Sequence, residues 1–378
     1  MARSPTDHAA SPPPPPRLRI TYFWEHAESL DWRAHHMNPY GGLLDQALRA
    51  YGVMLDPAVA FDLAGLWRRR RTHHGLHFNW ISGHYEHRDR WRGFWRLARF
   101  GLLLMVARAL GYRIVWTMHN LYPHERLVPR YSHWARLFIT RLAHAVICHC
   151  EHARALAAKH FGRTQGVWVI SHGTFRDAYP RTATRAAARE RFGLPPQAFV
   201  YGFFGNVRRY KGVQHLVEAF RQMPGDDLRL LIAGGPYRLD TQFLAEAQQA
   251  DPRIVMELHV IPNDEIQDVM AACDVMVMPF VTTLTSGSVI TAIGFEKPVV
   301  IPAVGCLPAL EPRGSCILIY DPRDPDGLLT TMRRARDLDL AQAARDAIAL
   351  SDALNWDAIA RRTIEAYGVP CPRSQVAA

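Results

Sequence analysis

Short apolar segments alternate with helical patterns along this chain, and the alternation occurs twice. The first series contains predicted strands at 17–24, 76–81, 113–118, 145–148 and 167–170. The second series runs from a predicted strand at 199–204 to another at 298–301. Strands that alternate with helices form parallel sheets covered by helices on both faces. The sequence therefore predicts an α/β protein with two doubly wound, Rossmann-like domains that face each other across a cleft.

The chain of 378 residues divides at a segment over 174–196, which is rich in Ala, Arg, Thr and Pro and has no strand pattern. We place the first domain at 17–190 and the second at 191–350, preceded by a disordered Pro-rich tail over 1–16. The helical pattern over 351–378 is too short for a third domain, and we expect it to pack back on the first. The tail lacks the apolar stretch of a secretory signal, and no segment approaches the roughly 20 apolar residues of a membrane span.

Six cysteines are scattered along the chain without a C-x-x-C spacing. Such usage is typical of a reducing, cytosolic compartment and not of a disulfide scaffold. Cys148, His149 and Cys150 are the densest group of possible metal ligands. Alternating side chains of a strand point to opposite faces, so these three do not converge on one ion. We therefore expect no metal site.

The charge is divided unevenly between the two halves of the chain. Residues 1–190 hold 27 basic and 13 acidic residues, a net charge of +14, whereas residues 191–378 have a net charge of −4. A basic half favours a phosphorylated substrate, an anionic membrane surface or a nucleic acid as partner. Charge alone does not separate these three.

Basic residues follow the first predicted strand of the second domain, in the segment 205–212. Gly205 allows a sharp turn there, and Arg208 and Lys211 can neutralise a diphosphate held near the amides of the next helix. Only three of the 45 basic residues are lysines, so a lysine at this position is informative. The segment predicts a phosphate-binding loop, with a solvated basic loop as the alternative.

A second candidate for anion binding lies later in the same domain. Thr285, Ser286 and Gly287 begin a predicted helix that runs to about residue 295. Hydroxyl and amide groups at a helix start either bind an anion or simply cap the helix. Together with the basic segment before it, this helix start favours a donor of diphosphate type.

Two features of the first domain are expected at the same cleft. Tyr40, Gly41 and Gly42 open a helical pattern that follows the first strand, and they form either a second helix N-terminus at the cleft or a simple turn. His119 leaves the end of a predicted strand, the place where catalytic side chains project in such folds. His119 can exchange a proton near neutral pH, and Glu125 can orient it or act as a second acid/base group.

A basic aromatic helix is predicted over 88–110. Trp91 and Trp95 recur at helical spacing among arginines that include Arg92 and Arg96. Such a helix fits an anionic membrane surface, with tryptophan at the boundary and arginine on the headgroups. The alternative is a crossover helix that packs on the sheet and leaves its arginines solvated.

Taken together, these features resemble the GT-B nucleotide-sugar glycosyltransferases, in the broad group around glycosyltransferase family 4. The segments that carry this resemblance are 41–42, 119, 205–212, 231–235, 274–279 and 286–300. Within the group, the chain is most similar to the bacterial exopolysaccharide β-1,4-mannosyltransferases of the xanthan-pathway type. That closer similarity rests on the strings at 38–40, 77–80, 119–125, 210–212 and 286–287.

The resemblance implies transfer of a sugar from a nucleotide diphosphate donor to a lipid-linked saccharide, without a cofactor or a bound metal. GDP-mannose is the favoured donor and a UDP-sugar is the other candidate. By analogy, Arg208 and Lys211 would hold the diphosphate, and Thr285, Ser286 and Gly287 would grip phosphate or ribose. The basic first domain would bind the acceptor, and the enzyme would be cytoplasmic and peripheral at the inner face of the plasma membrane. No nucleic-acid partner is implied.

One departure from the family pattern concerns stereochemistry. Many family-4 enzymes have two glutamates eight positions apart in the second domain, and the corresponding residues here are Thr283 and Thr291. The usual argument for retention of configuration is therefore absent, and xanthan-type relatives that lack the pair invert.

Three other functions remain open at this point. A sugar-nucleotide epimerase would share the fold, and a natural-product glycosyltransferase would use a soluble acceptor. A non-catalytic nucleic-acid-binding protein would use the arginine-rich half, although no recognised module is present and the second half is acidic.

Overall fold

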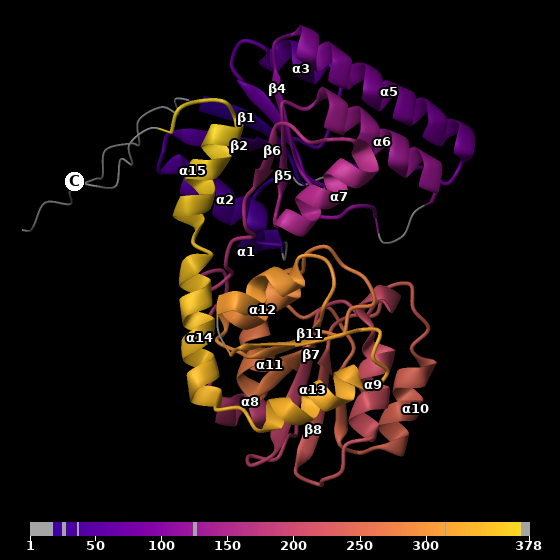
Figure 1. The fold of residues 1–378 in the computed structure, drawn as a ribbon, viewed down its shortest axis with the longest axis vertical. Coiled ribbons are helices and arrows are strands. Elements are labelled where there is room, and N and C mark those ends of the chain that lie inside the picture. The colour runs from indigo at the N-terminus through magenta and orange to yellow at the C-terminus, as the bar shows by residue number, and fades with distance from the viewer. Residues whose placement is uncertain (1–17, 25–27, 36–37, 124–126, 314, 372–378) are drawn as a thin grey trace, which may run out of the picture.

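The computed structural model describes residues 18–24, 28–35, 38–123, 127–313 and 315–371. These residues form two domains, each built around a six-stranded parallel sheet with helices on both faces (Figure 1). The predicted α/β class with two doubly wound sheets is confirmed. The predicted tail over 1–16 and the candidate Glu125 lie outside the described residues.

The first sheet has the strand order β2-β1-β3-β4-β5-β6. Its strands are β1 (Leu18–Phe23), β2 (Val53–Pro57), β3 (Gly75–Phe78), β4 (Arg113–Thr117), β5 (Ala145–Cys148) and β6 (Val167–Val169). Its helices are α1 (Trp32–His35), α2 (Tyr40–Arg49), α3 (Leu63–Arg69), α4 (Ser82–Tyr85), α5 (Arg90–Ala109), α6 (Pro129–Leu142) and α7 (Glu151–Phe161). Side chains along β1 alternate between the two faces of the sheet. Ile20 and Tyr22 pack in the core on the side of α2, whereas Phe23 packs in the core on the side of α5.

The second sheet has the strand order β12-β11-β10-β7-β8-β9. Its strands are β7 (Phe199–Phe204), β8 (Leu228–Ala233), β9 (Ile254–Glu257), β10 (Val275–Val277), β11 (Val299–Pro302) and β12 (Ile317–Tyr320). Its helices are α8 (Arg185–Arg191), α9 (Val213–Arg221), α10 (Gln242–Ala250), α11 (Ile266–Ala272), α12 (Gly287–Gly294), α13 (Gly327–Arg336) and α14 (Leu340–Ala353). Two 3₁₀ turns, η1 (Arg209–Lys211) and η2 (Leu307–Arg313), complete it.

Helix α8 lies within the segment expected to link the domains, and it packs against α11 of the second domain. Arg189 on this helix is almost fully buried, and its guanidinium donates to the Asp274 carboxylate at 2.8 Å. Asp274 also accepts from the backbone N–H of Val200 at the start of β7 and pairs with Arg185 of α8. Packing of the second domain therefore begins at α8, a few residues before position 191.

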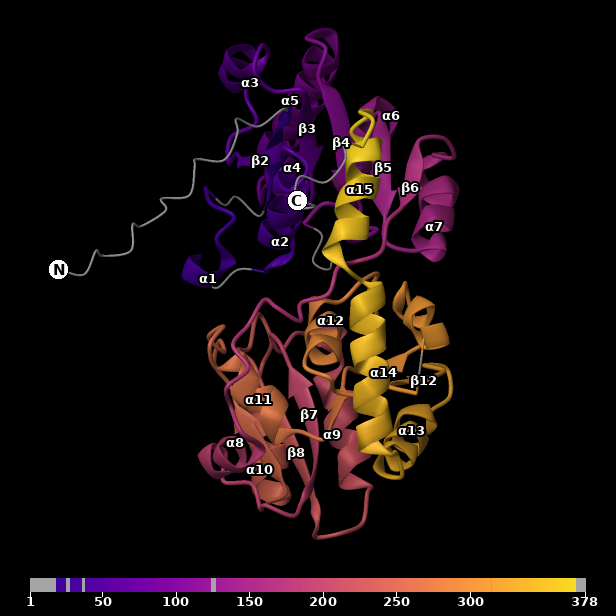
Figure 2. The same cartoon turned by 90° about the vertical axis from the view of Figure 1, so that its left-hand side faces the viewer.

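The chain returns to the first domain at its end. Helix α14 lies along the second domain, and α15 (Trp356–Ala366) packs against α2 of the first domain (Figures 1 and 2). Tyr367 anchors this crossing, because its hydroxyl lies 2.8 Å from the Nδ1 atom of His77 on β3.

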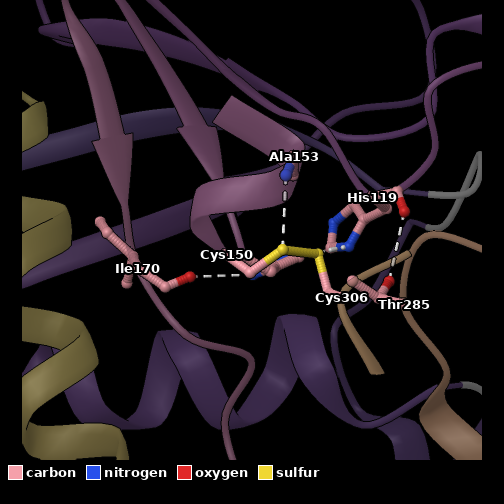
Figure 3. Close-up of a disulfide and its surroundings, with 7 residues drawn as sticks. His119, Cys150, Ala153, Ile170, Thr285 and Cys306 are labelled. Atoms are coloured by element: carbon pink, nitrogen blue, oxygen red, sulfur yellow. Dashed lines mark hydrogen bonds between the residues drawn. A yellow bond between two sulfur atoms is a disulfide. The ribbon is translucent and has the colours of Figure 1, made fainter. Parts of the chain in front are cut away.

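A disulfide between Cys150 and Cys306 also joins the two domains (Figure 3). Cys150 caps the start of α7 in the first domain, whereas Cys306 follows β11 in the second. The cysteine usage pointed to a reducing compartment, and the sequence did not predict this pair. The two cysteines are 156 positions apart, so only the arrangement of the two domains brings them together.

Candidate functional site

A cavity of about 470 Å³ lies between the two domains and is lined by residues of both. Loops that follow β3 and β4 of the first sheet and β7, β8 and β10 of the second form much of its wall. Ligands of doubly wound folds bind beyond the carboxyl ends of the strands, and this cavity has that position. His119, Arg208, Lys211, Thr285, Ser286 and Gly287, which the sequence predicted, all line it.

Lys211 is a buried cation in the wall of this cavity. Its Nζ donates to the Ser288 hydroxyl at 3.0 Å. Burial is the main cause that lowers the pKa of Lys211 to about 8, with Arg208 as a second cause. Gly205 makes room for the amine, since a Cβ at this position would lie 2.7 Å from Nζ. The φ angle of Gly205 is +119°, a conformation that favours glycine.

Arg208 lies at the same cavity and is half-exposed. Its guanidinium carbon is 4.0 Å from the centroid of the Tyr237 ring, a cation–π contact that orients the side chain. Lys211 and Arg208 thus place two cations beside the start of α9. The predicted phosphate-binding segment is arranged to meet an anion.

The start of α12 lines the cavity next to Lys211 and also touches the first domain. The Ser286 hydroxyl accepts from the backbone N–H of Val289, so it caps the helix as the alternative interpretation expected. The Thr285 hydroxyl donates to the backbone carbonyl of His119 at 3.2 Å, across the domain boundary (Figure 3). This hydrogen bond connects the two halves of the site directly.

Both ring nitrogens of His119 have protein partners. Nε2 lies 2.9 Å from Oδ1 of Asn79, and Nδ1 lies 3.2 Å from Nε2 of His149. The ring stacks on Trp80, with centroids 4.6 Å apart. Burial is the main cause that lowers the pKa of His119 well below its usual value. A role as general base would require one of these hydrogen bonds to break.

Tyr40, Gly41 and Gly42 lie in the first turn of α2, beneath the cavity and not in its wall. Gly41 packs under the Trp24 ring, and a Cβ on Gly42 would lie 2.2 Å from the ring of Trp32. The two glycines therefore allow close packing of α2. The residues that reach the cavity from this segment are Asn38 and Pro39.

The predicted basic aromatic helix is α5, and it divides into two faces. Leu97, Phe100 and Leu104 are buried, which fits the crossover-helix alternative. On the outer face, Trp91 and Trp95 have exposed fractions of 76% and 67%. Arg92 is exposed, whereas Arg96 is half-buried and donates to the Gly83 carbonyl. The same helix thus packs on the core and exposes tryptophan and arginine side chains on its outer face. Figure 1 shows α5 at the end of the first domain that is far from the second.

The two threonines in place of the glutamate pair both donate to nearby backbone carbonyls. Thr283 donates to the carbonyl of Thr285 at 2.7 Å, and Thr291 donates to the carbonyl of Gly287 at 2.9 Å. Both line the cavity. No Asp or Glu among the described residues does so.

The site residues predicted from the sequence did not include several residues of the cavity and their partners. Ser288 pairs with Lys211, Asn79 and His149 pair with His119, and Asn263 lies in the wall. Asn79 stands in a string already used for the resemblance, so its place at the end of β3 was a usable signal. Within the described ranges, no three His, Cys, Asp or Glu side chains are grouped to hold a metal ion. None of the helices in this part of the chain is long and apolar enough to cross a membrane.

Residues 198–337 match the family model described as "Glycosyl transferases group 1". The chain is 27% identical over 228 residues to the GDP-mannose:glycolipid 4-beta-D-mannosyltransferase of Xanthomonas campestris pv. campestris, and the aligned region covers 60% of each chain. It is 34% identical over 154 residues to the 2-deoxystreptamine glucosyltransferase of Streptomyces kanamyceticus, which covers 39% of each. The matched region thus spans less than two thirds of either relative.

Solved structures match nearly the whole chain at low identity. The sucrose-phosphate synthase of Thermosynechococcus elongatus has a TM-score of 0.71 at 17% identity, covering 93% of this chain and 98% of that one. Anabaena Alr3699/HepE in complex with UDP and glucose has a TM-score of 0.65 at 16% identity, covering 93% and 100%. The whole chain therefore has the GT-B fold, and the match to the group 1 glycosyl transferase model lies within its second domain.

Proposed function

We propose that this protein is a metal-independent glycosyltransferase that moves a sugar from a nucleotide diphosphate donor to a lipid-linked saccharide. The observation that carries the proposal is the interdomain cavity with Lys211 and Arg208 at one wall and His119 at the other. Two cations at a helix start are suited to hold a diphosphate and to stabilise the charge that develops as it leaves. The second domain would thus bind the donor.

Mannose from GDP-mannose is the favoured donor sugar, and a UDP-sugar is the alternative. The Xanthomonas relative is described as acting with GDP-mannose and a glycolipid, which supports the first choice. The Anabaena structure holds UDP and glucose, which supports the second. Bacterial exopolysaccharide or glycolipid synthesis is the process in which we place the reaction.

A second cavity suggests where the acceptor enters. It has a volume of about 350 Å³ and shares Asn120 and Thr283 with the donor cavity. Leu121 and Tyr122 of the first domain and Leu284 of the second give it an aromatic and apolar wall. Such a wall is suited to the faces of sugar rings. We place the acceptor saccharide there. His119 in the adjoining donor cavity and Glu125, which lies outside the described residues, are the candidates for the acid/base group.

The outer face of α5 supports a peripheral position at an anionic membrane of the cytoplasmic side. Trp91 and Trp95 are exposed there beside Arg92. Sedimentation with vesicles tests this proposal: the protein should pellet with anionic vesicles and not with zwitterionic ones. A double variant, Trp91→Ala with Trp95→Ala, should remain in the supernatant at an unchanged unfolding temperature. Failure of the wild type to pellet would contradict membrane docking.

A soluble acceptor of natural-product type is the second candidate. The similarity to the 2-deoxystreptamine glucosyltransferase favours it, since that name describes a small soluble acceptor. Transfer of radiolabelled sugar into a butanol-extractable glycolipid, compared with transfer to aminocyclitols, separates the two.

The donor class is tested by thermal shift with GDP, UDP, GDP-mannose and UDP-glucose. A ligand that binds only the folded protein raises the unfolding temperature. We expect a clear shift with guanosine ligands and a smaller one with uridine ligands. Absence of a shift with all four would contradict the proposed function and would favour the nucleic-acid alternative.

A further inference from the structure

His119 and His149 form a buried imidazole pair, of which His119 lines the donor cavity. Nδ1 of His119 and Nε2 of His149 are 3.2 Å apart. The outer nitrogens also have partners, since Nε2 of His119 lies 2.9 Å from Oδ1 of Asn79 and Nδ1 of His149 lies 3.0 Å from the carbonyl of Ile170. The two side chains are almost fully buried, so water does not replace these partners.

The partners of this pair are acceptors at both ends. The Ile170 carbonyl can only accept, so Nδ1 of His149 must carry a hydrogen. The amide of Asn79 is oriented by its Nδ2 group, which donates to the carbonyl of Phe23 at 3.1 Å. Its Oδ1 atom therefore faces His119, and Nε2 of His119 must also carry a hydrogen.

The number of protons then decides the charge. Three hydrogen bonds along this chain require three hydrogens, whereas two neutral imidazoles have only two. A neutral pair that satisfies both ends brings two lone pairs together between His119 and His149. All three hydrogen bonds are formed only when the pair holds one extra proton and one positive charge.

The surroundings oppose that charge while the cavity holds no anion. Burial lowers the pKa of His149 to about 4 and that of His119 well below its usual value. The ionisable groups that face the pair from the elements around it are Tyr22 and Tyr40, His77, His172, and Arg208 and Lys211 across the cavity. None of these is a carboxylate, and two are cations. An anion in the cavity would reverse this balance.

We infer that His119 and His149 together take up one proton when the diphosphate of a nucleotide sugar enters the cavity. The charged pair then faces the diphosphate from the first domain while Lys211 and Arg208 face it from the second. His149 acts through His119 and is a positioning residue. This inference rests on the proposed function, because it assumes a nucleotide sugar as ligand.

Calorimetric titration of the full-length protein tests proton uptake. GDP-mannose and UDP-glucose are the probes, because their diphosphate diesters do not titrate near neutral pH. Lys211, with a pKa of about 8, is mostly charged below pH 7 and contributes little there. Between pH 6.0 and 7.0 we expect Kd to rise three- to tenfold. At pH 6.5, binding heats in two buffers of different ionisation enthalpy should give an uptake of at least half a proton.

Variants assign the proton to the pair. His149→Gln should bind with a Kd that changes less than twofold over this range. His77→Gln is the matched control, because His77 is buried between the hydroxyls of Thr117 and Tyr367, which can either donate or accept. It should keep the wild-type pH dependence.

A wild-type Kd that changes less than threefold, or a His149→Gln variant with wild-type uptake, would overturn the inference and leave the proposed function intact. Absence of binding by either probe at any pH would overturn both. If a variant does not fold, the wild-type titrations in two buffers alone decide whether a proton is taken up on binding.

Discussion

In the proposed function Lys211 must be charged to hold a diphosphate, yet it lies in a place that disfavours charge. Its amine is buried against Ser288, and burial lowers its pKa to about 8. A desolvated cation interacts more strongly with a bound anion than a solvated one does. The same burial makes the contact sensitive to pH, because the amine loses its proton as the pH rises above about 8. Donor affinity should therefore fall on the alkaline side.

Lys211→Ala should lower turnover at saturating donor by about 10²- to 10³-fold, a loss of about 2.7–4 kcal/mol in transition-state stabilisation. The physical reason is the loss of one preorganised cation next to the departing diphosphate. Lys159→Ala is the matched control, since Lys159 is exposed on α7 outside the cavity. Steady-state rates of sugar transfer measure the effect. An unchanged kcat in Lys211→Ala would exclude this role.

Among the secondary elements, the two strands that the sequence analysis missed are both at sheet edges. β2 and β12 are the outermost strands of their sheets. The sequence of β2, Val-Met-Leu-Asp-Pro, ends in two residues that are rare in strands, because its outer edge needs no hydrogen-bonded neighbour. β12 has a clear apolar pattern, Ile-Leu-Ile-Tyr, so the sequence before the C-terminal helices did contain a signal for this strand.

The central strands and the second-domain site were more predictable. Predicted strands such as 145–148 and 199–204 coincide with β5 and β7, because buried parallel strands are apolar throughout. Lys211 could be placed because its loop follows a strand directly. The His119–His149 pair could not, since its geometry depends on the neighbouring positions of β4 and β5 in the sheet.

His77 connects three elements by hydrogen bonds, and its burial leads us to expect that acid destabilises the first domain. It lies on β3 and bonds to Thr117 on β4 and to Tyr367 after α15. Burial lowers its pKa to about 3, whereas an unfolded histidine has its usual value near 6.5. The unfolded state therefore binds the proton first, and stability is lost as the pH falls from about 6.5 toward 3.

At pH 5 this single histidine should cost about 2 kcal/mol of the free energy of unfolding relative to pH 7. His77→Gln should be less stable than the wild type at both pH values. The loss in its free energy of unfolding between pH 7 and pH 5 should nevertheless be smaller by that amount. Denaturant titrations at pH 7 and pH 5 measure it. His215→Gln, at an exposed position on α9, should behave like the wild type. An equal acid sensitivity in His77→Gln would contradict this account.

At the scale of the whole molecule, the connections that hold the domains together include the crossing of the chain from α14 to α15 and the disulfide between Cys150 and Cys306. The disulfide lies beside His119 and Thr285, whose hydrogen bond also spans the boundary (Figure 3). Leu284 and Cys306 of the second domain pack into a core of the first. Opening of the cavity therefore involves the disulfide.

Because the disulfide closes a loop of 156 residues, its removal should cost about 2–5 kcal/mol of stability. Titration of thiols in denaturant should find four in the unreduced protein and six after reduction with a dithiol. In Cys306→Ser, hydrogen exchange should increase at 117–121 and 283–286, the segments that meet through Thr285 and His119, while the two sheets stay protected. Cys148→Ala removes a buried, unbonded thiol near the same place and should leave that exchange unchanged. Six thiols without reductant would show that the pair is not formed, and unchanged exchange in Cys306→Ser would show that the remaining contacts alone hold the cavity closed.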